Sequence, residues 1–221
     1  MLRKQHIFRK SLCLILILSL ILLPVGCKNT SSDAVTYLEQ TSEEQLIHLM
    51  ELAACTQIHP ANSCRKGFSS PTDLSSADLY NLFEVNVEQS TLNQYYREDD
   101  KQYHIPVNTV TAFLENYFLD FQFDPVSLIS DGRNITLEEN NTVLVTSGIV
   151  GFPANIADFL TIEKTEILSS DFVSVTAVYQ WPEDPSFVYY TLSLQIKNGH
   201  PYLNKLTVMT TPKRGGMTSG L

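Results

Sequence analysis

The apolar positions along this chain change their spacing near Asp131-Gly132. Before this point they recur every three or four residues, which is the spacing of an amphipathic helix. After it they alternate with polar residues, as in strands that bury one face. Helices followed by strands predict an α+β fold. Residues 41–210 have the length and the apolar content of a single domain with its own core.

Three helices are predicted from this pattern. The first follows Ser42-Glu43-Glu44-Gln45, which has the form of a capping box, and its apolar face runs from Leu46 to Ala54. A shorter helix is predicted over residues 76–83. The third begins at Pro106, because a residue without an N–H is tolerated in a first helical turn. Its apolar face consists of Val110, Phe113, Leu114, Tyr117 and Phe118.

Six strands are predicted beyond residue 131, and turn residues separate them. They cover residues 135–137, 143–149, 162–168, 172–181, 187–197 and 201–209. Their order predicts a curved antiparallel meander. Earlier in the chain, tyrosines and a histidine flank the charged run 97–101, which predicts a hairpin around a charged turn. The alternative is an aromatic surface that stacks on a glycan or a peptide.

The register of the last two strands decides which side chains face the core. Both strands carry their apolar residues at even positions, so a three-residue loop over 197–199 is predicted rather than the two-residue loop Asn198-Gly199. This register places Leu194 opposite Tyr202. On the other side of the central strand, we expect Trp181 opposite Val188.

The same register puts Asn204 on the apolar face, where a buried amide needs a partner. That partner is either a group of the protein itself or a bound ligand. If the domain has a ligand pocket, we expect it here, beneath the third helix. The predicted lining is Asn204, Tyr190, Tyr202, Phe113 and Tyr117.

The sequence predicts no catalytic residue, no cofactor and no metal site. It contains no CxxC, HExxH, GxGxxG, Walker or GxSxG motif, and its histidines lack the spacing of metal ligands. His104 is therefore interpreted as an isolated structural histidine. The acidic loop with Trp181, Glu183 and Asp184 is either a partner-binding loop or a strand end with solvated carboxylates.

The N-terminus has the plan of a signal peptide. Four basic residues before position 11 precede the apolar run 12–23, and at about 18 Å this run is too short for a stable span of the roughly 30 Å hydrocarbon layer. The following Val25-Gly26-Cys27 resembles the lipobox of bacterial lipoproteins. The alternative is an ordinary secretory signal with an incidental cysteine.

The lipobox resemblance implies that Cys27 becomes the first residue and carries a diacylglyceryl thioether with long acyl chains such as palmitate. The implied organisation is a signal peptide over 1–26, a lipidated cysteine with a flexible tether over 27–40, the domain over 41–210 and a disordered tail over 211–221. The location would be the extracytoplasmic face of the cell membrane. Removal of residues 1–26 takes away four positive charges and moves the formal net charge from −9 to −13. This charge argues against nucleic acid as a partner.

Such a compartment permits disulfides. Cys55 and Cys64 close a short loop, and a bond between them is predicted to stabilise the fold by about 2.7 kcal/mol in the chain-entropy model. The alternative is two unpaired thiols.

The order of elements over 76–209 is similar to the NTF2-like and cystatin-like α+β folds. These folds host both enzymes and binding modules, so the resemblance implies no activity. The first hypothesis is a membrane-anchored, non-catalytic lipoprotein that binds an envelope protein or a small ligand. The alternatives are a small pocket enzyme with an acid or base group inside an NTF2-like cone, and a purely structural envelope protein.

Overall fold

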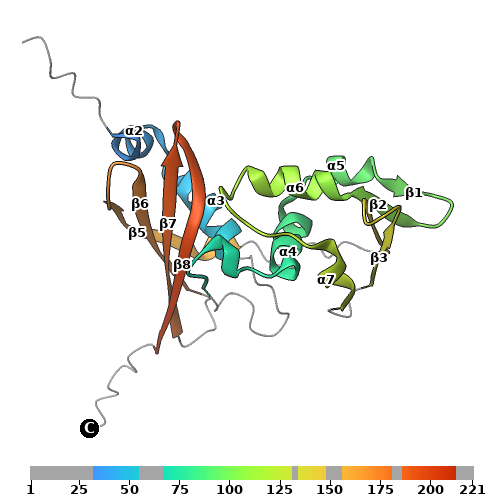
Figure 1. The fold of residues 1–221 in the computed structure, drawn as a ribbon. Helices are drawn as coiled ribbons and strands as arrows, with labels where there is room; N and C mark the ends of the chain where they lie inside the picture. The colour runs from blue at the N-terminus through green and yellow to red at the C-terminus, as the bar shows by residue number, and fades with distance from the viewer. Residues whose placement is uncertain (1–31, 55–66, 131–133, 148–155, 181–185, 213–221) are drawn as a thin grey trace, which may run out of the picture. The chain divides into compact units, whose positions relative to one another are not determined.

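A computed structural model describes residues 32–54, 67–130, 134–147, 156–180 and 186–212 of the chain (Figure 1). Over these ranges the chain forms helices and two four-stranded antiparallel sheets. The α+β class predicted from the sequence is therefore confirmed. No helix in these ranges is long and apolar enough to span a membrane.

The larger sheet contains the last four strands in the order of the chain. These are β5 (Leu160–Ile167), β6 (Phe172–Tyr179), β7 (Ser186–Lys197) and β8 (His200–Pro212). Each strand is antiparallel to the next, which confirms a meander in this part of the chain. β8 runs two residues beyond the predicted end of the domain at residue 210.

Helix α3 (Glu43–Ala54) packs against all four strands of the larger sheet. The predicted capping box is present at its start. The Ser42 N–H donates to Oε1 of Gln45 at 2.9 Å, and the Gln45 N–H donates to Oγ of Ser42 at 3.3 Å. These two bonds satisfy N–H groups that have no partner inside the helix, so the helix begins at this position.

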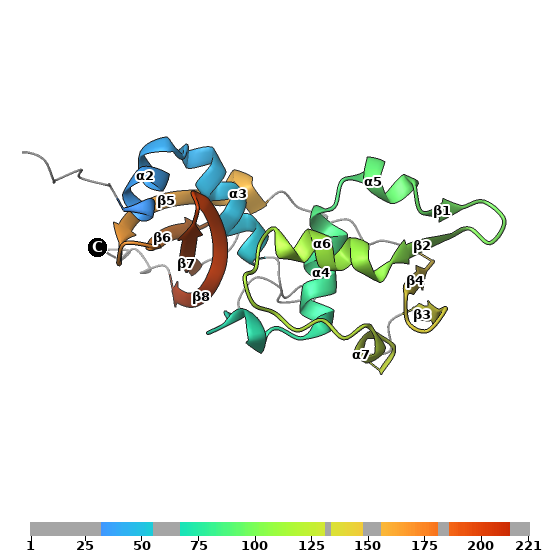
Figure 2. The same ribbon diagram turned by 45° about the horizontal axis from the view of Figure 1, so that its top comes forward.

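The predicted flexible tether over 27–40 is wrong for residues 33–40, which form helix α2 (Asp33–Gln40). Ala34 and Tyr37 are buried, and the Ala34 N–H donates to the carbonyl of Ser170 at 3.0 Å. Figure 2 shows α2 beside β5 and β6. An eight-residue helix is marginal by itself, so its stability comes from this packing and not from a long periodic pattern.

The smaller sheet has the strand order β1-β2-β4-β3. Its strands are β1 (Tyr96–Arg97), β2 (Gln102–Pro106), β3 (Ile135–Glu138) and β4 (Val143–Thr146). Tyr96 pairs with Tyr103, which confirms the hairpin around the charged turn. The prediction of one continuous meander is wrong, because β4 pairs with β2 and so joins a separate sheet.

Short helices connect and cover this sheet. They are α4 (Ser76–Asn86), α5 (Gln89–Asn93), α6 (Val107–Glu115) and α7 (Pro125–Ser130). The 3-10 turns at Pro71–Asp73 and Ile156–Phe159 contact the larger sheet instead, at β8 and β6. α4 contacts both α6 and α7. The predicted helices at 76–83 and after Pro106 are confirmed, and Pro106 is the N-cap of α6.

The hairpin between β7 and β8 has a two-residue loop, so the predicted three-residue loop is wrong. Lys197 pairs with His200 across the turn. Asn198 has φ of 54° and Gly199 has φ of 76°. Positive φ at both central residues is the geometry of the type I′ turn, which Asn-Gly favours.

A β-bulge at Asn204 explains how this shorter loop keeps the core intact. The ladder changes register between the pairs Leu194–Leu203 and Ser193–Lys205, which leaves Asn204 as the extra residue. Leu203 and Leu206 are therefore both buried. The predicted pairing of Leu194 with Tyr202 is wrong, because the two-residue turn already places Leu203 opposite Leu194 before the ladder reaches the bulge.

The predicted register between β6 and β7 is wrong by two residues. Val188 lies opposite Tyr179 and not opposite Trp181, which is outside the described residues. A shift of two keeps every side chain on its predicted face. Val188 is accordingly buried.

Candidate functional site

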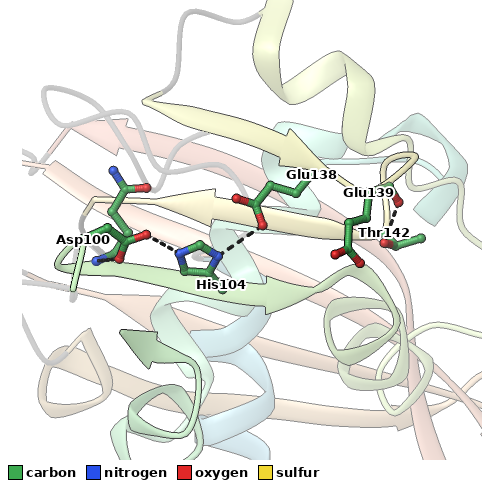
Figure 3. Close-up of polar contacts among 6 residues, drawn as sticks. Asp100, His104, Glu138, Glu139 and Thr142 are labelled. Atoms are coloured by element: carbon green, nitrogen blue, oxygen red, sulfur yellow. Dashed lines mark hydrogen bonds and ion pairs between the residues drawn. The ribbon is translucent and has the colours of Figure 1, made fainter. Parts of the chain in front are cut away.

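His104 is a buried histidine on β2 that lies between two carboxylates (Figure 3). Its Nε2 is 2.6 Å from Oδ2 of Asp100, and its Nδ1 is 3.3 Å from Oε2 of Glu138. The imidazole side chain is only 5% exposed, whereas the side chains of Asp100 and Glu138 are 39% and 44% exposed. The cluster therefore lies at the boundary between the protein interior and water.

Two local features bring these groups together. Asp100 lies in the turn between β1 and β2, where its Oδ1 accepts the N–H of Gln102 at 3.0 Å and directs the carboxylate back toward β2. Glu138 comes from β3, on the other side of β4. His104 pairs with Val145 and Glu138 pairs with Val143. Because residues two apart on a strand share a face, both side chains project from the same face of the sheet.

The electrostatics of the cluster favour the ionised form of Asp100. The hydrogen bond from His104 holds the pKa of Asp100 below its usual value of 3.8, against a smaller opposing effect of desolvation. The Gln102 N–H and the charges of His104 and Arg97 lower this pKa further. Both ring nitrogens of His104 face carboxylate oxygens, so only the doubly protonated imidazolium donates a proton to each of them.

This arrangement joins the β1–β2 hairpin to β3 and leaves neither ring nitrogen free. A general base must reach a substrate proton directly or through one water, and each nitrogen of this ring already faces a carboxylate. Over the described ranges, no group of three His, Cys, Asp or Glu residues is placed to hold a metal ion. The contacts of His104 therefore link the β1–β2 turn to β3 through its two ring nitrogens.

Only the contact between Asp100 and His104 could be recognised from the sequence. Asp100 precedes His104 by four residues in a charged turn, which is visible in the sequence. Glu138 is not detectable in this way, because its approach depends on the pairing of β2 and β3 with β4.

A cavity of about 580 Å³ lies beside α2 and α3, at the end of the larger sheet that carries the β7–β8 turn. Its lining residues are Tyr37, Gln40, Thr41, Glu44, Gln45, His48, Leu49, Gly199 and Pro201. The sequence does not predict this cavity, because a tether over 27–40 would supply no wall, whereas α2 lines the cavity with Tyr37 and Gln40.

The cavity combines apolar and polar groups. Tyr37 and Leu49 are buried, whereas Gln40, Glu44 and His48 are exposed. Burial raises the pKa of the Tyr37 hydroxyl, which keeps it neutral and able to donate a hydrogen bond. Apolar surface with a few polar groups is typical of sites for small molecules.

The pocket predicted around Asn204 does not form. Tyr190 is fully buried, and its ring meets that of Tyr179 edge-on at 6.5 Å between centroids. Tyr202 pairs with Gln195 and lies on the opposite face of the sheet from Tyr190. Asn204 is the half-buried bulge residue. The two-residue turn is the physical reason, since it places Leu203, and not Tyr202 or Asn204, opposite the buried Leu194.

The helix residues of the predicted pocket belong to the core around α4 and α6. The ring of Phe113 lies 5.2 Å from that of Tyr117 and 5.4 Å from that of Phe83. Burial raises the pKa of Tyr117. Tyr202 instead lines a different cavity of about 470 Å³, together with Glu115 of α6, Phe118 and other residues in and after this helix.

The remaining predicted site residues lie outside the described ranges. They are Cys27, Cys55, Cys64, Trp181, Glu183 and Asp184. Lipidation, the disulfide and the partner-binding loop therefore stay predictions.

No family model matches the chain, and neither a curated protein nor a solved structure matches it. The likeness to NTF2-like or cystatin-like folds also stays a prediction from the order of elements.

Proposed function

We propose that this chain is a lipoprotein anchored through Cys27 to the extracytoplasmic face of the cell membrane, with a non-catalytic folded part that binds a partner or a small ligand. The observation that carries the proposal is the border LPVGCK, where a basic segment and an apolar run end at Val25-Gly26-Cys27. Two long acyl chains would make membrane binding stable, because each buried methylene contributes about 0.8 kcal/mol.

The geometry of the folded part supports binding over catalysis. The cavity beside α2 and α3 offers polar groups around the buried side chains of Tyr37 and Leu49. His104, a natural candidate for acid or base chemistry, has both ring nitrogens engaged by carboxylates.

Metabolic labelling tests the anchor. In cells supplied with an alkyne-tagged palmitate, the wild type should carry the label, and Cys27→Ala should lose it. Cys13→Ala is the matched control, because Cys13 lies inside the apolar run and should not be needed for labelling. A wild-type protein that never labels and fractionates as soluble would contradict the proposal.

Site-specific photo-crosslinking tests the binding role. A photoreactive amino acid replaces Gln40, an exposed residue of the cavity, or the equally exposed Gln89 on α5 as the control. We expect a discrete adduct from position 40 that is absent from position 89 and lost in Glu44→Lys. No adduct from position 40, or the same adducts from both positions, would contradict binding at this cavity.

A further inference from the structure

The turn between β5 and β6 exposes two consecutive large apolar side chains. Ile167 is 48% exposed and Leu168 is 58% exposed, although Val173, the strand partner of Ile167, is fully buried. Single exposed apolar residues are common on protein surfaces and need no explanation. An adjacent pair at the tip of a sheet presents a more concentrated apolar surface.

Hydrogen bonds fix the shape of this turn. The N–H groups of Leu168 and Ser169 both donate to the carbonyl of Phe172, at 2.9 and 3.3 Å. The Ser169 hydroxyl donates to Oδ1 of Asp171 at 2.8 Å. The apolar pair therefore belongs to an ordered turn.

The turn lies beside the first helix of the described chain. The Ala34 N–H of α2 donates to the carbonyl of Ser170 in this turn, and Figure 1 shows α2 next to the connection between β5 and β6. The Ile196 N–H donates to the carbonyl of Asp171 at 2.7 Å, which brings the β7–β8 end of the sheet to the same place.

The length of chain before α2 limits how far this end can lie from an anchor at Cys27. Seven residues lead from Cys27 to Ala34, and fully extended they reach about 25 Å. Met209 lies on β8, eight residues beyond Pro201, which is roughly 26 Å further along the sheet. An acylated Cys27 therefore keeps the β5–β6 turn within about 25 Å of the lipid, whereas the chain length allows Met209 to lie farther away.

We propose that Ile167 and Leu168 contact the lipid surface, so that the β5–β6 turn is the part of the larger sheet that touches the membrane. This inference rests on the proposed anchor at Cys27. The acyl chains on Cys27 would keep the protein bound to the membrane. They would also raise the effective concentration of the turn at the lipid. The turn then needs only a weak affinity of its own to set the orientation of the domain.

The charges around the turn identify the kind of contact. Asp33, Glu166 and Asp171 are acidic, Lys164 is engaged by Glu166 at 2.6 Å, and the exposed Lys197 ends β7 beside the turn, so acidic residues outnumber basic ones. Anionic headgroups would not attract this surface. The contact is therefore apolar, through the interface between headgroups and acyl chains, and we expect it in vesicles of neutral phosphatidylcholine.

Fluorescence quenching tests this orientation. The full lipidated chain is reconstituted into phosphatidylcholine vesicles, with an environment-sensitive fluorescent amino acid at Leu168, at Ile167 or at Met209. Met209 is the matched control because it is an apolar residue of the same sheet with a similar exposure of 59%. Probes at 167 and 168 should be quenched by a spin-labelled lipid and should lose quenching by aqueous iodide. The probe at 209 should behave in the opposite way.

The two possible failures are distinguishable in the same samples. If the chain floats with the vesicles but the probes at 167, 168 and 209 are equally quenched by iodide, the orientation is overturned and the anchor stands. If the chain carries no acyl group and does not float, the anchor and the orientation are both overturned.

Discussion

Leu203 donates its backbone N–H to the carbonyl of Tyr117 at 2.8 Å, and this bond lies on the outer edge of β8. Phe68 exchanges two backbone hydrogen bonds with Leu206 on the same edge, at 2.9 and 3.0 Å. An uncovered edge strand presents unpaired N–H and C=O groups to other chains. Two segments distant in sequence therefore protect the last strand of the larger sheet.

Gly67→Ala should destabilise the protein by opening this edge. A Cβ atom at position 67 would overlap the carbonyl oxygen of Leu206, so the backbone must shift. We expect the free energy of unfolding in urea to fall by about 1–3 kcal/mol. Gly199→Ala is the comparison, because a Cβ there meets open space and only the φ of +76° is unfavourable, at about 1–2 kcal/mol. A Gly67→Ala variant as stable as the wild type would contradict the close approach.

Deletion of Asn204 should be tolerated better than deletion of Thr207. Removal of the bulge residue leaves Leu206 opposite Leu192, whereas removal of Thr207 turns Val208 to the outer face. We expect the Asn204 deletion to be more stable by about 2 kcal/mol in denaturant unfolding, since it preserves the buried face. The reverse order would show that the bulge lies elsewhere.

The fold was predictable where it depends on neighbouring residues. The capping box at Ser42 correctly predicted the start of α3, and the charged run 97–101 correctly predicted the β1–β2 hairpin. The register of β8 was not predictable in this way. The bulge at Asn204 lets a two-residue turn coexist with a continuous apolar face, and a single extra residue in a strand has no local signature.

The candidate sites were likewise predictable only where they depend on residues close in sequence. Asp100 and His104 belong to one hairpin and lie close in sequence, whereas Glu138 reaches them only through the β2-β4-β3 pairing. The cavity beside α2 depends on a helix of eight residues that tertiary packing stabilises. Apolar period alone could not distinguish this helix from a tether.

The stability of the protein should fall in acid partly through Asp100. Its pKa is lower in the folded state than the usual 3.8, so its contribution is complete above the unfolded pKa and is lost as the pH falls through the folded pKa. The free energy of unfolding of the wild type should therefore decrease more steeply below about pH 4 than that of Asp100→Asn.

A comparison of single and double variants tests whether His104 is the residue that lowers the pKa of Asp100. The hydrogen bond from His104 is the largest cause of the lowered pKa, so the difference between Asp and Asn at position 100 should shrink in a His104→Gln background. An undiminished difference in that background would assign the pH dependence to another group.

Cys55 and Cys64 should be joined in protein isolated from its natural compartment. Intact mass is measured after alkylation, with and without prior reduction, and the two thiols should accept alkyl groups only after reduction. The bond should stabilise the fold by about 2.7 kcal/mol in the chain-entropy model. Two alkylated cysteines in the unreduced, folded protein would contradict the bond.

The mass of the N-terminal peptide tests most directly whether Cys27 anchors this protein. A protease that cleaves after acidic residues releases residues 27–33 from the mature chain, because Asp33 is the first acidic residue after Cys27. We predict that protein extracted from membranes yields this peptide with a diacylglyceryl group on Cys27. A peptide that begins at another residue, or one that begins at Cys27 with a free thiol, would contradict the lipid anchor.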